Sequence, residues 1–324
     1  MRYFKEALGS DGTIHASNSS FSSALQVSDK QLITPGIYDN SYIQNLLTYC
    51  SENKIDMIVP CFDIDLPVLA KSKHLFKNQG IEVIVSDYEV TQICNDKWKT
   101  FQLLNSLDIS TPDSCLSIDE CKVKLDNGEL KFPLIIKPRW GMGSIGIYQV
   151  DNKVELKVLY KKVKKDILNS YLSFESTQDL EKCVIIQQKI DGTEFGLDVF
   201  NDLNGNFLAC ISKKKISMRA GETDIAETLE DSKLFDIGKS LSESLHHTAN
   251  LDVDCIKVGE SYFVLDLNCR FGGQYPFAHL AGVNFPKALI NMVKGIAVDQ
   301  NLLIASPGIK GFKDLIPMIY KNGK

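Results

Sequence analysis

The spacing of apolar residues changes about a third of the way along this chain, and that change limits the folds it can adopt. In the first ninety residues, short apolar runs alternate with segments whose apolar residues recur at helical spacing. Strands that alternate with helices form a parallel sheet covered on both faces. The expected strands are residues 13–16, 31–34, 56–61 and 81–86.

The beginning of the chain departs from the usual plan of such a domain. Residues 2–8 have the pattern of a helix that ends at Gly9. A doubly wound domain normally opens with a strand and a glycine-rich turn, and neither is found here. Residues 1–92 are therefore predicted to form an α/β domain whose parallel sheet lacks its usual first strand.

The rest of the chain carries the signals of hairpins. A connecting helix is expected at residues 93–107 and ends before Pro112. Asn-Gly and Asp-Gly pairs follow several apolar runs, as they do in antiparallel hairpins. The expected strands are residues 134–137, 146–150, 184–187, 196–200, 207–212, 254–258 and 261–267, with helices at 154–169 and 234–248. We predict an α+β region with largely antiparallel sheets, divided into residues 93–189 and residues 190–324.

Composition argues against several classes of protein. Hydrophobic residues are 44% and charged residues 24% of the chain, the balance of a soluble globular protein. The net charge of -5 disfavours a surface that coats nucleic acid, because such surfaces carry an excess of Lys and Arg. Nine cysteines without close pairs fit neither a disulfide framework nor a zinc site, and they suit a reducing cytoplasm. No signal-peptide pattern or membrane-length apolar run occurs, so neither a membrane nor nucleic acid is an expected partner.

The first chemical motif combines a lysine with several glycines in residues 135–146. An apolar strand delivers Lys137, and a loop with three glycines and a serine follows. Glycines let backbone N–H groups approach phosphate oxygens closely, and a lysine supplies compact positive charge. The lysine precedes the glycines and no helix follows them, which excludes a Walker A loop and a dinucleotide fingerprint. Alone, the segment is explained equally well as a glycine-rich hairpin with an incidental lysine.

The second motif is an apolar strand, residues 184–187, followed by a polar hinge, a turn and a carboxylate. Backbone groups of such a hinge can bind adenine. The ionised Glu194 can accept hydrogen bonds from both hydroxyls of a ribose. Alone, this segment is more simply explained as a strand, a turn and a solvated glutamate.

The third motif gathers oxygen ligands. Asp266 and Asn268 alternate on an expected strand, so both side chains lie on one face. Asp254 begins the neighbouring strand of the expected hairpin, and Arg270 follows the motif on the same face. Three oxygen ligands on one face suit Mg²⁺, and an arginine beside them can hold a phosphoryl group. A polar sheet face capped by an arginine is the less favoured explanation.

A fourth cluster is basic. Lys213 and Lys215 alternate on an expected strand, and Arg219 follows a few residues later. Cations beside a phosphate site are useful, but a basic edge strand is the common explanation of such a pattern.

Together, and in this order, the motifs resemble those of the ATP-grasp superfamily. The chain is most similar to single-chain proteins that resemble the large subunit of carbamoyl-phosphate synthase, among the carboxylate–amine ligases. The resemblance covers essentially the whole chain, and its motifs are weak singly but specific jointly. It implies that the two α+β units are the two subdomains of an ATP-grasp fold.

The resemblance also implies roles for individual residues. Lys97 and Lys137 would contact the phosphates of ATP. The loop with Gly141, Gly143 and Ser144 would be a mobile flap over those phosphates.

The hinge is implied to hold the nucleoside. Gln187, Gln188 and Ile190 would frame the adenine, mostly through backbone groups. Glu194 would hold the ribose. Relatives often have a glutamate where one of the two glutamines stands, and an amide can still accept from the adenine amino group.

The remaining residues are implied to serve the reaction. The implied ligands for Mg²⁺, or alternatively Mn²⁺, are Asp254, Asp266 and Asn268. Arg270 would stabilise the transferred phosphoryl group, while Lys215 and Arg219 would contact phosphate or the acyl substrate. The metal motif usually reads Glu-x-Asn-Pro-Arg, whereas here an aspartate, one methylene shorter, replaces the glutamate and Cys269 replaces the proline.

The resemblance implies an ATP-dependent ligase that joins a carboxylate to an amine or to ammonia. An acyl phosphate would be the intermediate, and ADP and phosphate would be released. The expected partners are small carboxylates and amines, and a homodimer is an arrangement that the sequence leaves open. Two alternatives remain: a nucleotide-binding regulatory protein that has lost turnover, and an enzyme that activates bicarbonate or forms carbamoyl phosphate.

Overall fold

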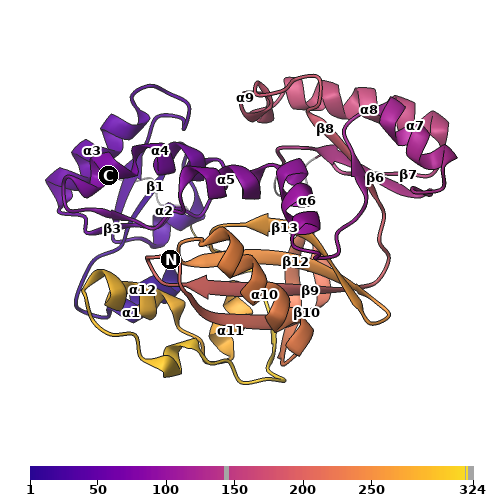
Figure 1. Ribbon diagram of the computed structural model, residues 1–324. Helices are drawn as coiled ribbons and strands as arrows, with labels where there is room; N and C mark the ends of the chain where they lie inside the picture. Colours follow the sequence, from indigo (N-terminus) through magenta and orange to yellow (C-terminus); the bar gives the residue numbers. More distant parts are fainter. Residues whose placement is uncertain (142–145, 318, 320–324) are drawn as a thin grey trace.

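The computed structural model describes residues 1–141, 146–317 and 319, which Figure 1 shows as three connected parts. An N-terminal domain lies at the left, a small subdomain at the upper right and a large subdomain below them. Helices α5 (Tyr88–Asn95) and α6 (Lys97–Ser106) run between the first two parts, above the sheet of the third. Two predicted site residues, Gly143 and Ser144, lie outside the described residues.

The N-terminal domain is an α/β unit with parallel strand pairs. Its elements are α1 (Arg2–Leu8), β1 (His15–Asn18), α2 (Ser23–Val27), β2 (Lys30–Ile33), α3 (Tyr42–Asn53), β3 (Met57–Ile58), α4 (Asp65–Lys77) and β4 (Glu82–Val83). β1 pairs with β2 and β3 pairs with β4, both in parallel. The predicted parallel α/β class and the opening helix are therefore confirmed, although the ladders are shorter than the apolar runs suggested.

The predicted connecting helix at residues 93–107 is wrong, because two helices replace it. The break lies at Asp96, whose backbone is extended, with φ -102° and ψ 103°. Its side chain accepts hydrogen bonds from the backbone N–H groups of Trp98 and Lys99, at 3.0 and 3.4 Å. An aspartate at this position satisfies the free N–H groups of a new helix, so α6 starts at Lys97 in a new direction.

The small subdomain is a four-stranded antiparallel sheet covered by helices. The strand order is β5-β8-β6-β7. The elements are β5 (Ser114–Cys115), α7 (Ile118–Asp126), β6 (Leu134–Pro138), β7 (Tyr148–Val150), α8 (Lys153–Leu168), α9 (Leu172–Ser176) and β8 (Val184–Gln188). Its buried apolar side chains, such as Ile136 and Val163, form a core of their own.

The large subdomain is a six-stranded antiparallel sheet in the order β13-β12-β9-β10-β11-β14. Its elements are β9 (Thr193–Asn201), β10 (Phe207–Arg219), β11 (Glu222–Leu229), α10 (Ser232–Leu245), β12 (Asn250–Val258), β13 (Ser261–Asn268), α11 (Tyr275–Leu280), α12 (Phe285–Val293), η1 (Gln300–Leu303) and β14 (Lys310–Phe312). The sequence prediction missed β5 and β14, which are very short, and β11, which is mostly polar. It also began β12 four residues late, at Asp254 instead of Asn250.

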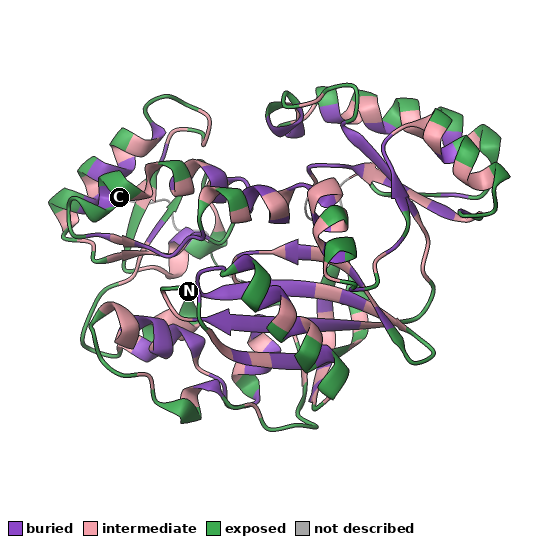
Figure 2. Cartoon of the chain, in the orientation of Figure 1, coloured by how far each residue is buried: buried purple, intermediate pink, exposed green. Residues whose placement is uncertain are grey.

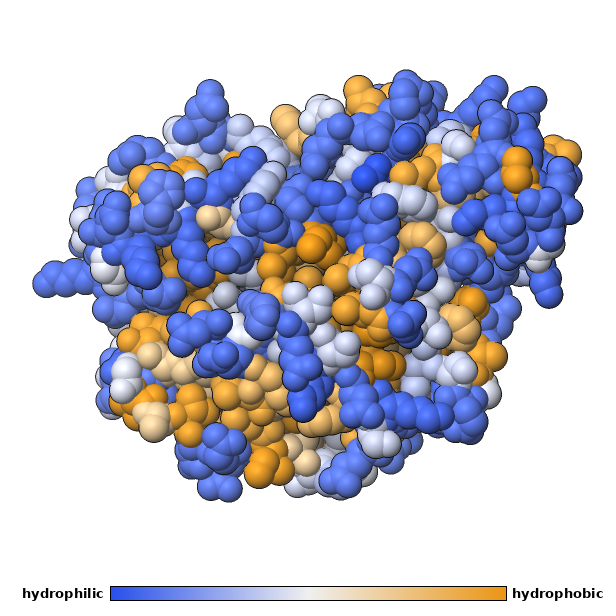
Figure 3. Space-filling view, in the orientation of Figure 1, coloured by the Kyte–Doolittle hydropathy of each residue, from blue (hydrophilic) through white to orange (hydrophobic). Residues whose placement is uncertain are grey.

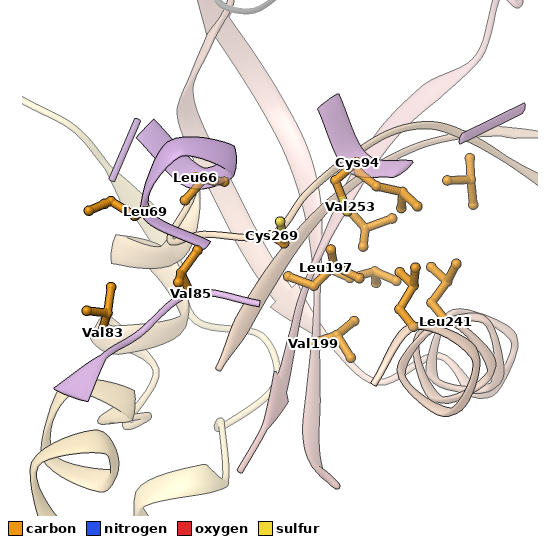
Figure 4. Packing of buried hydrophobic residues seen from close by; sticks show 14 of the residues in the cluster. Leu66, Leu69, Val83, Val85, Cys94, Leu197, Val199, Leu241, Val253 and Cys269 are labelled. Atoms are coloured by element: carbon orange, nitrogen blue, oxygen red, sulfur yellow. The ribbon is translucent and has the colours of Figure 1, made fainter. Parts of the chain in front are cut away.

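One apolar core joins the N-terminal domain to the large subdomain. Figure 4 shows Leu66 and Val85 of the N-terminal domain on one side of Cys269, with Cys94 of α5 and Val253 of β12 on its other side. Figure 2 shows the strands of the large sheet as largely buried, with exposed residues on the outer sides of the helices. These two parts are therefore held together by apolar packing, whereas the small subdomain has a separate core.

The outer surface is mixed. Figure 3 shows hydrophilic side chains over the N-terminal domain and the small subdomain, and more apolar ones over the lower part of this face. Within the part of the chain that the structure describes, no helix combines the length and the apolar character needed to cross a membrane.

Polar contacts attach the small subdomain to the rest. The guanidinium of Arg139, at the end of β6, donates two hydrogen bonds of 2.7 Å to the carboxylate of Asp96. Both side chains are buried, at 10% and 1% exposure. On another element, the Tyr38 hydroxyl of the N-terminal domain donates to Glu175 of α9 at 2.6 Å.

We expect Asp96→Ala to lower the free energy of unfolding by about 3–5 kcal/mol, because it removes the closer partner of the buried Arg139 guanidinium and leaves it the longer contact of 3.7 Å with Asp179. Urea and thermal unfolding would measure this change. Asp96→Asn keeps the helix cap acceptor and isolates the loss of the ion pair. The control is Asp119→Ala, which removes the exposed pair with Lys122 and should change stability little. Equal stability of the Asp96→Ala and Asp119→Ala variants would show that the buried pair is not a major attachment.

Candidate functional site

Four oxygen-bearing side chains form a row on one face of the large sheet. Asp254 of β12 lies directly opposite Asp266 of β13, and Asp252 lies opposite Asn268. Residues opposite each other in an antiparallel ladder point to the same side, and alternation keeps both pairs on that side. The predicted hairpin therefore brings the three predicted metal ligands together. Asp252 was missed, although its spacing of two from Asp254 on one strand could have identified it.

Two lysines from different elements pair with two of these carboxylates. The Lys97 ammonium, at the start of α6, lies 2.6 Å from Asp266 Oδ2. The Lys215 ammonium, on β10, pairs with Asp254 Oδ1. Burial opposes the charge of Lys215, but the Asp254 carboxylate outweighs it and raises the lysine pKa. The two lysines neutralise carboxylates that would otherwise repel each other across the ladder.

Lys137 lies opposite this row, on β6 of the small subdomain. Burial lowers the pKa of its ammonium to about 8, and the nearby positive charge of Lys97 adds to this effect. The carboxylates of Asp266 and Asp254 act in the opposite direction, so all four charges lie close enough to interact. No ion pair of Lys137 occurs among the described residues. A lysine of this kind can accept an anion, because binding one would restore its full charge.

Arg270 is held between two parts of the molecule. Its guanidinium contacts Asp63 of the N-terminal domain at 3.0 and 3.1 Å and Asp252 of the large sheet at 2.8 Å. Burial would lower the pKa of Arg270, but the two carboxylates outweigh it and raise the pKa above its usual value. Arg270 is thus fixed next to the metal-ligand row, with both of its partners in place.

A buried polar layer supports the row from the neighbouring strands. Lys213 and Asp198 form an ion pair, and neither side chain is exposed. The Asn250 side chain donates to Asp198 at 3.1 Å and to the backbone carbonyl of Arg270 at 3.2 Å. Lys213 therefore supports the backbone at the site through Asp198, and it does not face the row as a free cation.

Two close approaches in this layer require glycine. A Cβ atom on Gly272 would overlap the Asp252 carboxylate. A Cβ atom on Gly196 would overlap the Gln274 side chain, which itself donates to Asp252. The Gly-Gly pair that follows Arg270 thus has a packing reason, which the sequence alone did not reveal.

The side chains of the hinge after β8 are held by hydrogen bonds. The Gln187 side chain donates to Ser114 Oγ at 2.9 Å, and the Gln188 side chain bonds to backbone groups of Lys131 and Pro133. The backbone of Ile190 makes no hydrogen bond to another described residue, so it is available to a ligand. The hinge side chains therefore fix the shape of the hinge and leave backbone groups to contact a base.

The other predicted residues lie at different distances from the row. Glu194 lies opposite Ile256 in the ladder, on the face that carries Asp254, and its charge acts on Lys215. Gly141 lines the cavity described next. Arg219 lies at the end of β10, is 44% exposed and pairs with Asp224 at 2.6 Å. Arg219 is therefore engaged by a carboxylate that does not belong to the row.

A cavity of about 10 Å³ lies where the three parts meet. This volume holds about one water molecule. The cavity is lined by Asp63, Ile64, Cys94, Asn95, Lys97, Trp140, Gly141, Glu175 and Asn268. Sequence reasoning missed Trp140 and Glu175. Trp140 stands in the glycine loop and could have been noticed there, but nothing in the sequence around Glu175 marks it.

The residues of the row fit a magnesium ion. Asp266 Oδ1 is buried and has no hydrogen-bond partner among the described residues, and the second oxygen of Asp254 also makes no bond there. With the amide of Asn268 they offer the hard oxygen donors that Mg²⁺ prefers. The described residues contain no cluster of three or more His, Cys, Asp or Glu side chains that could hold a metal ion. A magnesium ion here would therefore need phosphate or water oxygens to complete its shell.

Comparisons with known proteins agree with this architecture. The family model "PylC-like, N-terminal domain" matches residues 1–84, and the model "ATP-grasp domain" matches residues 94–274. The carbamoyl phosphate synthase large chain of Clostridium acetobutylicum is 22% identical over 271 residues, which are 80% of this chain. They are 24% of that protein, so this chain spans about a quarter of its length.

Solved structures share the fold. A biotin carboxylase of Campylobacter jejuni, described as a complex with β-γ-ATP, superposes with a TM-score of 0.73 at 15% sequence identity. The superposition covers 94% of this chain and 71% of the biotin carboxylase chain. An L-amino acid ligase of Bacillus licheniformis superposes with a TM-score of 0.64 at 18% sequence identity, and the superposition covers 90% of this chain and 71% of the ligase chain. Because the ATP-grasp model matches more than half of the 324 residues, the chain belongs to the ATP-grasp superfamily of ATP-dependent ligases.

Proposed function

We propose that this protein is an ATP- and Mg²⁺-dependent ligase that joins a carboxylate to an amine or ammonia through an acyl phosphate. The observation that carries the proposal is the meeting of Lys97, Lys137, Asp254 and Asp266, which come from separate segments of the chain. Two cations and two carboxylates at one place suit a triphosphate with its metal ion.

ATP would lie between the two ATP-grasp subdomains. The hinge at Gln187, Gln188 and Ile190 would contact adenine through backbone groups, and Glu194 would hold the ribose. The Campylobacter jejuni biotin carboxylase that shares this fold is a complex with β-γ-ATP, which supports a nucleotide between the subdomains here. The loop that follows Gly141 would cover the phosphates.

Asp254, Asp266 and Asn268 would hold Mg²⁺, which supplies positive charge to the phosphate oxygens when it is bound. Lys97, which pairs with Asp266, and Lys137 of β6 would add positive charge. Phosphoryl transfer depends mainly on position and charge, so these residues would stabilise the charge that develops on the γ-phosphoryl group. Arg270 would stabilise the same phosphoryl group from its fixed position between Asp63 and Asp252. The roles of Lys215 and Arg219 as substrate contacts stay predictions.

The chemistry would proceed in two steps. The carboxylate attacks the γ-phosphorus of ATP, the bond to ADP breaks, and an acyl phosphate forms. The amine, after it loses a proton, attacks the acyl carbon, and phosphate leaves as the amide forms. Because water would hydrolyse the acyl phosphate, the site would have to close over this intermediate.

The alternatives differ in what they predict for turnover. A regulatory protein would bind ATP but release no phosphate when carboxylates and amines are added. Activation of bicarbonate, the other alternative, would need the same ATP site and would release phosphate when bicarbonate takes the place of the carboxylate. A homodimer and a cytoplasmic location stay predictions.

We expect Asp266→Ala to lower kcat at least about a hundredfold in a phosphate-release screen of carboxylates and amines with Mg²⁺-ATP. The reason is the loss of a metal ligand that also pairs with Lys97. Asp236→Ala, at an exposed position of α10, is the control and should keep full activity. Undiminished turnover by the Asp266→Ala variant would refute the metal assignment. A wild-type protein that never releases phosphate with any substrate pair would favour the regulatory alternative.

We expect Lys137 to react with an amine-selective acylating reagent faster than ordinary lysines at pH 8. With a pKa of about 8 it is about half unprotonated there, roughly a hundredfold more than an ordinary lysine. Mass spectrometry would measure the labelling from pH 7 to 9, with the exposed Lys162, whose pKa is raised by Asp166, as the internal control. ATP should protect Lys137 and leave Lys162 unchanged. Equal labelling of the two lysines, or labelling of Lys137 that ATP does not slow, would contradict the proposed phosphate contact.

A further inference from the structure

Glu175 is a buried carboxylate that forms no ion pair within the part of the chain that the structure describes. Its residue exposure is 8%, and it stands on α9 of the small subdomain. The Tyr38 hydroxyl donates to Oε1 at 2.6 Å, and the Gln178 side chain donates to Oε2 at 3.3 Å. Among the described residues, no Lys, Arg or His forms an ion pair with it. A buried carboxylate of this kind favours the binding of a cation.

Two other charged residues line the cavity with Glu175, and each forms an ion pair with another residue. Asp63 contacts the guanidinium of Arg270, and Lys97 contacts Asp266. Glu175 is thus the cavity-lining charge whose partner is not found in the described residues. A ligand that enters the cavity would meet an unbalanced negative charge on this side.

Trp140 supplies an independent observation. It is 4% exposed and lines the same cavity, and its indole N–H has no hydrogen-bond acceptor among the described residues. The guanidinium of Arg139 lies 4.3 Å from the centre of the ring, which holds the ring in place. A buried donor without an acceptor is costly unless a ligand or water satisfies it.

The cavity is next to the place where the acyl phosphate would form. Asn268 of the metal-ligand row and Lys97, the partner of Asp266, both line it. A molecule in the cavity would therefore be close to the acyl carbon. Tyr38 links the acid to the N-terminal domain, so all three parts of the chain contribute to this site.

We propose that this cavity is the amine site, where the Glu175 carboxylate binds the ammonium group of the second substrate and Trp140 forms part of the wall beside it. The inference rests on the proposed ligase function and names its recognition residues. The ligand chemistry is an ammonium group, either a free ammonium ion or the end of a primary amine. The volume of about 10 Å³ admits an ion the size of water, and a larger amine would require α9 to move away from the loop of Tyr38.

The kinetic test is Glu175→Gln, which keeps the size of the side chain and an acceptor for Tyr38 but removes the charge. KM for the amine should rise at least about tenfold, the loss expected from a hydrogen bond to a charged group, while KM for ATP stays unchanged. Glu181→Gln is the matched control, because Glu181 is in the same subdomain and its side chain is 89% exposed. An unchanged KM for the amine in the Glu175→Gln enzyme would overturn the inference while leaving the ligase function intact.

A binding measurement decides the question without turnover. The chain has two tryptophans, so Trp98→Phe leaves Trp140 as the one indole, and its fluorescence reports on the cavity. Ammonium chloride and small primary amines should change this fluorescence saturably, whereas sodium chloride and tetramethylammonium chloride at equal ionic strength should not. The response should disappear in Trp98→Phe/Glu175→Gln.

Titration with ammonium chloride and titration with primary amines distinguish a free ammonium ion from an amine substrate as the ligand. A response to ammonium alone would assign the cavity to the free ion, and a response to primary amines would assign it to an amine substrate. A folded Trp98→Phe protein with no saturable response to either would overturn the inference. Failure of the wild-type protein to release phosphate would refute the ligase function instead, and the fluorescence result would still stand.

Discussion

The pairing of two carboxylates with lysines from outside their hairpin is the interaction on which this site depends. Asp254 and Asp266 lie directly opposite each other, and like charges in that position repel. Lys215 and Lys97 neutralise them. This pairing ties β10 and α6 to the hairpin, so the position of the connecting helices is fixed by the charges of the site as well as by the apolar core.

The same charges explain why the fold suits a metal-bound triphosphate. A divalent cation can replace the lysines at the carboxylates, and phosphate oxygens can take up the lysines that are released. Lys137 has no carboxylate partner among the described residues, and burial lowers its pKa to about 8. A phosphate that binds beside it would favour the protonated form and so would meet a fully charged ammonium group. The carboxylates are thus neutralised by lysines of the chain itself, and nucleotide and metal bound together would offer partners of opposite charge to the same groups.

Local sequence patterns predicted the features that depend on one strand or one hairpin. Alternation alone placed Asp266 and Asn268 on one face, and the turn chemistry predicted the hairpin that brings Asp254 to them. The break at Asp96 could not be predicted, because its side chain serves both as a helix cap and as the partner of Arg139, which lies 43 residues away. Glu175 was missed for the same reason: its neighbours come from the N-terminal domain and from α6, and no local pattern encodes that packing.

The separate core of the small subdomain has a consequence for access to the site. The N-terminal domain and the large subdomain share one apolar core, whereas the described contacts of the small subdomain with them include the polar pairs Arg139–Asp96 and Tyr38–Glu175. Opening an apolar core exposes its buried area to water without compensation, whereas both groups of a polar pair can be hydrated when they separate. Substrates would therefore enter by displacement of the small subdomain as a unit. Lys137, Trp140 and Glu175 all belong to that subdomain. When the small subdomain closes again on the large one, it would bring the phosphate contact and two of the cavity-lining residues back to the site together.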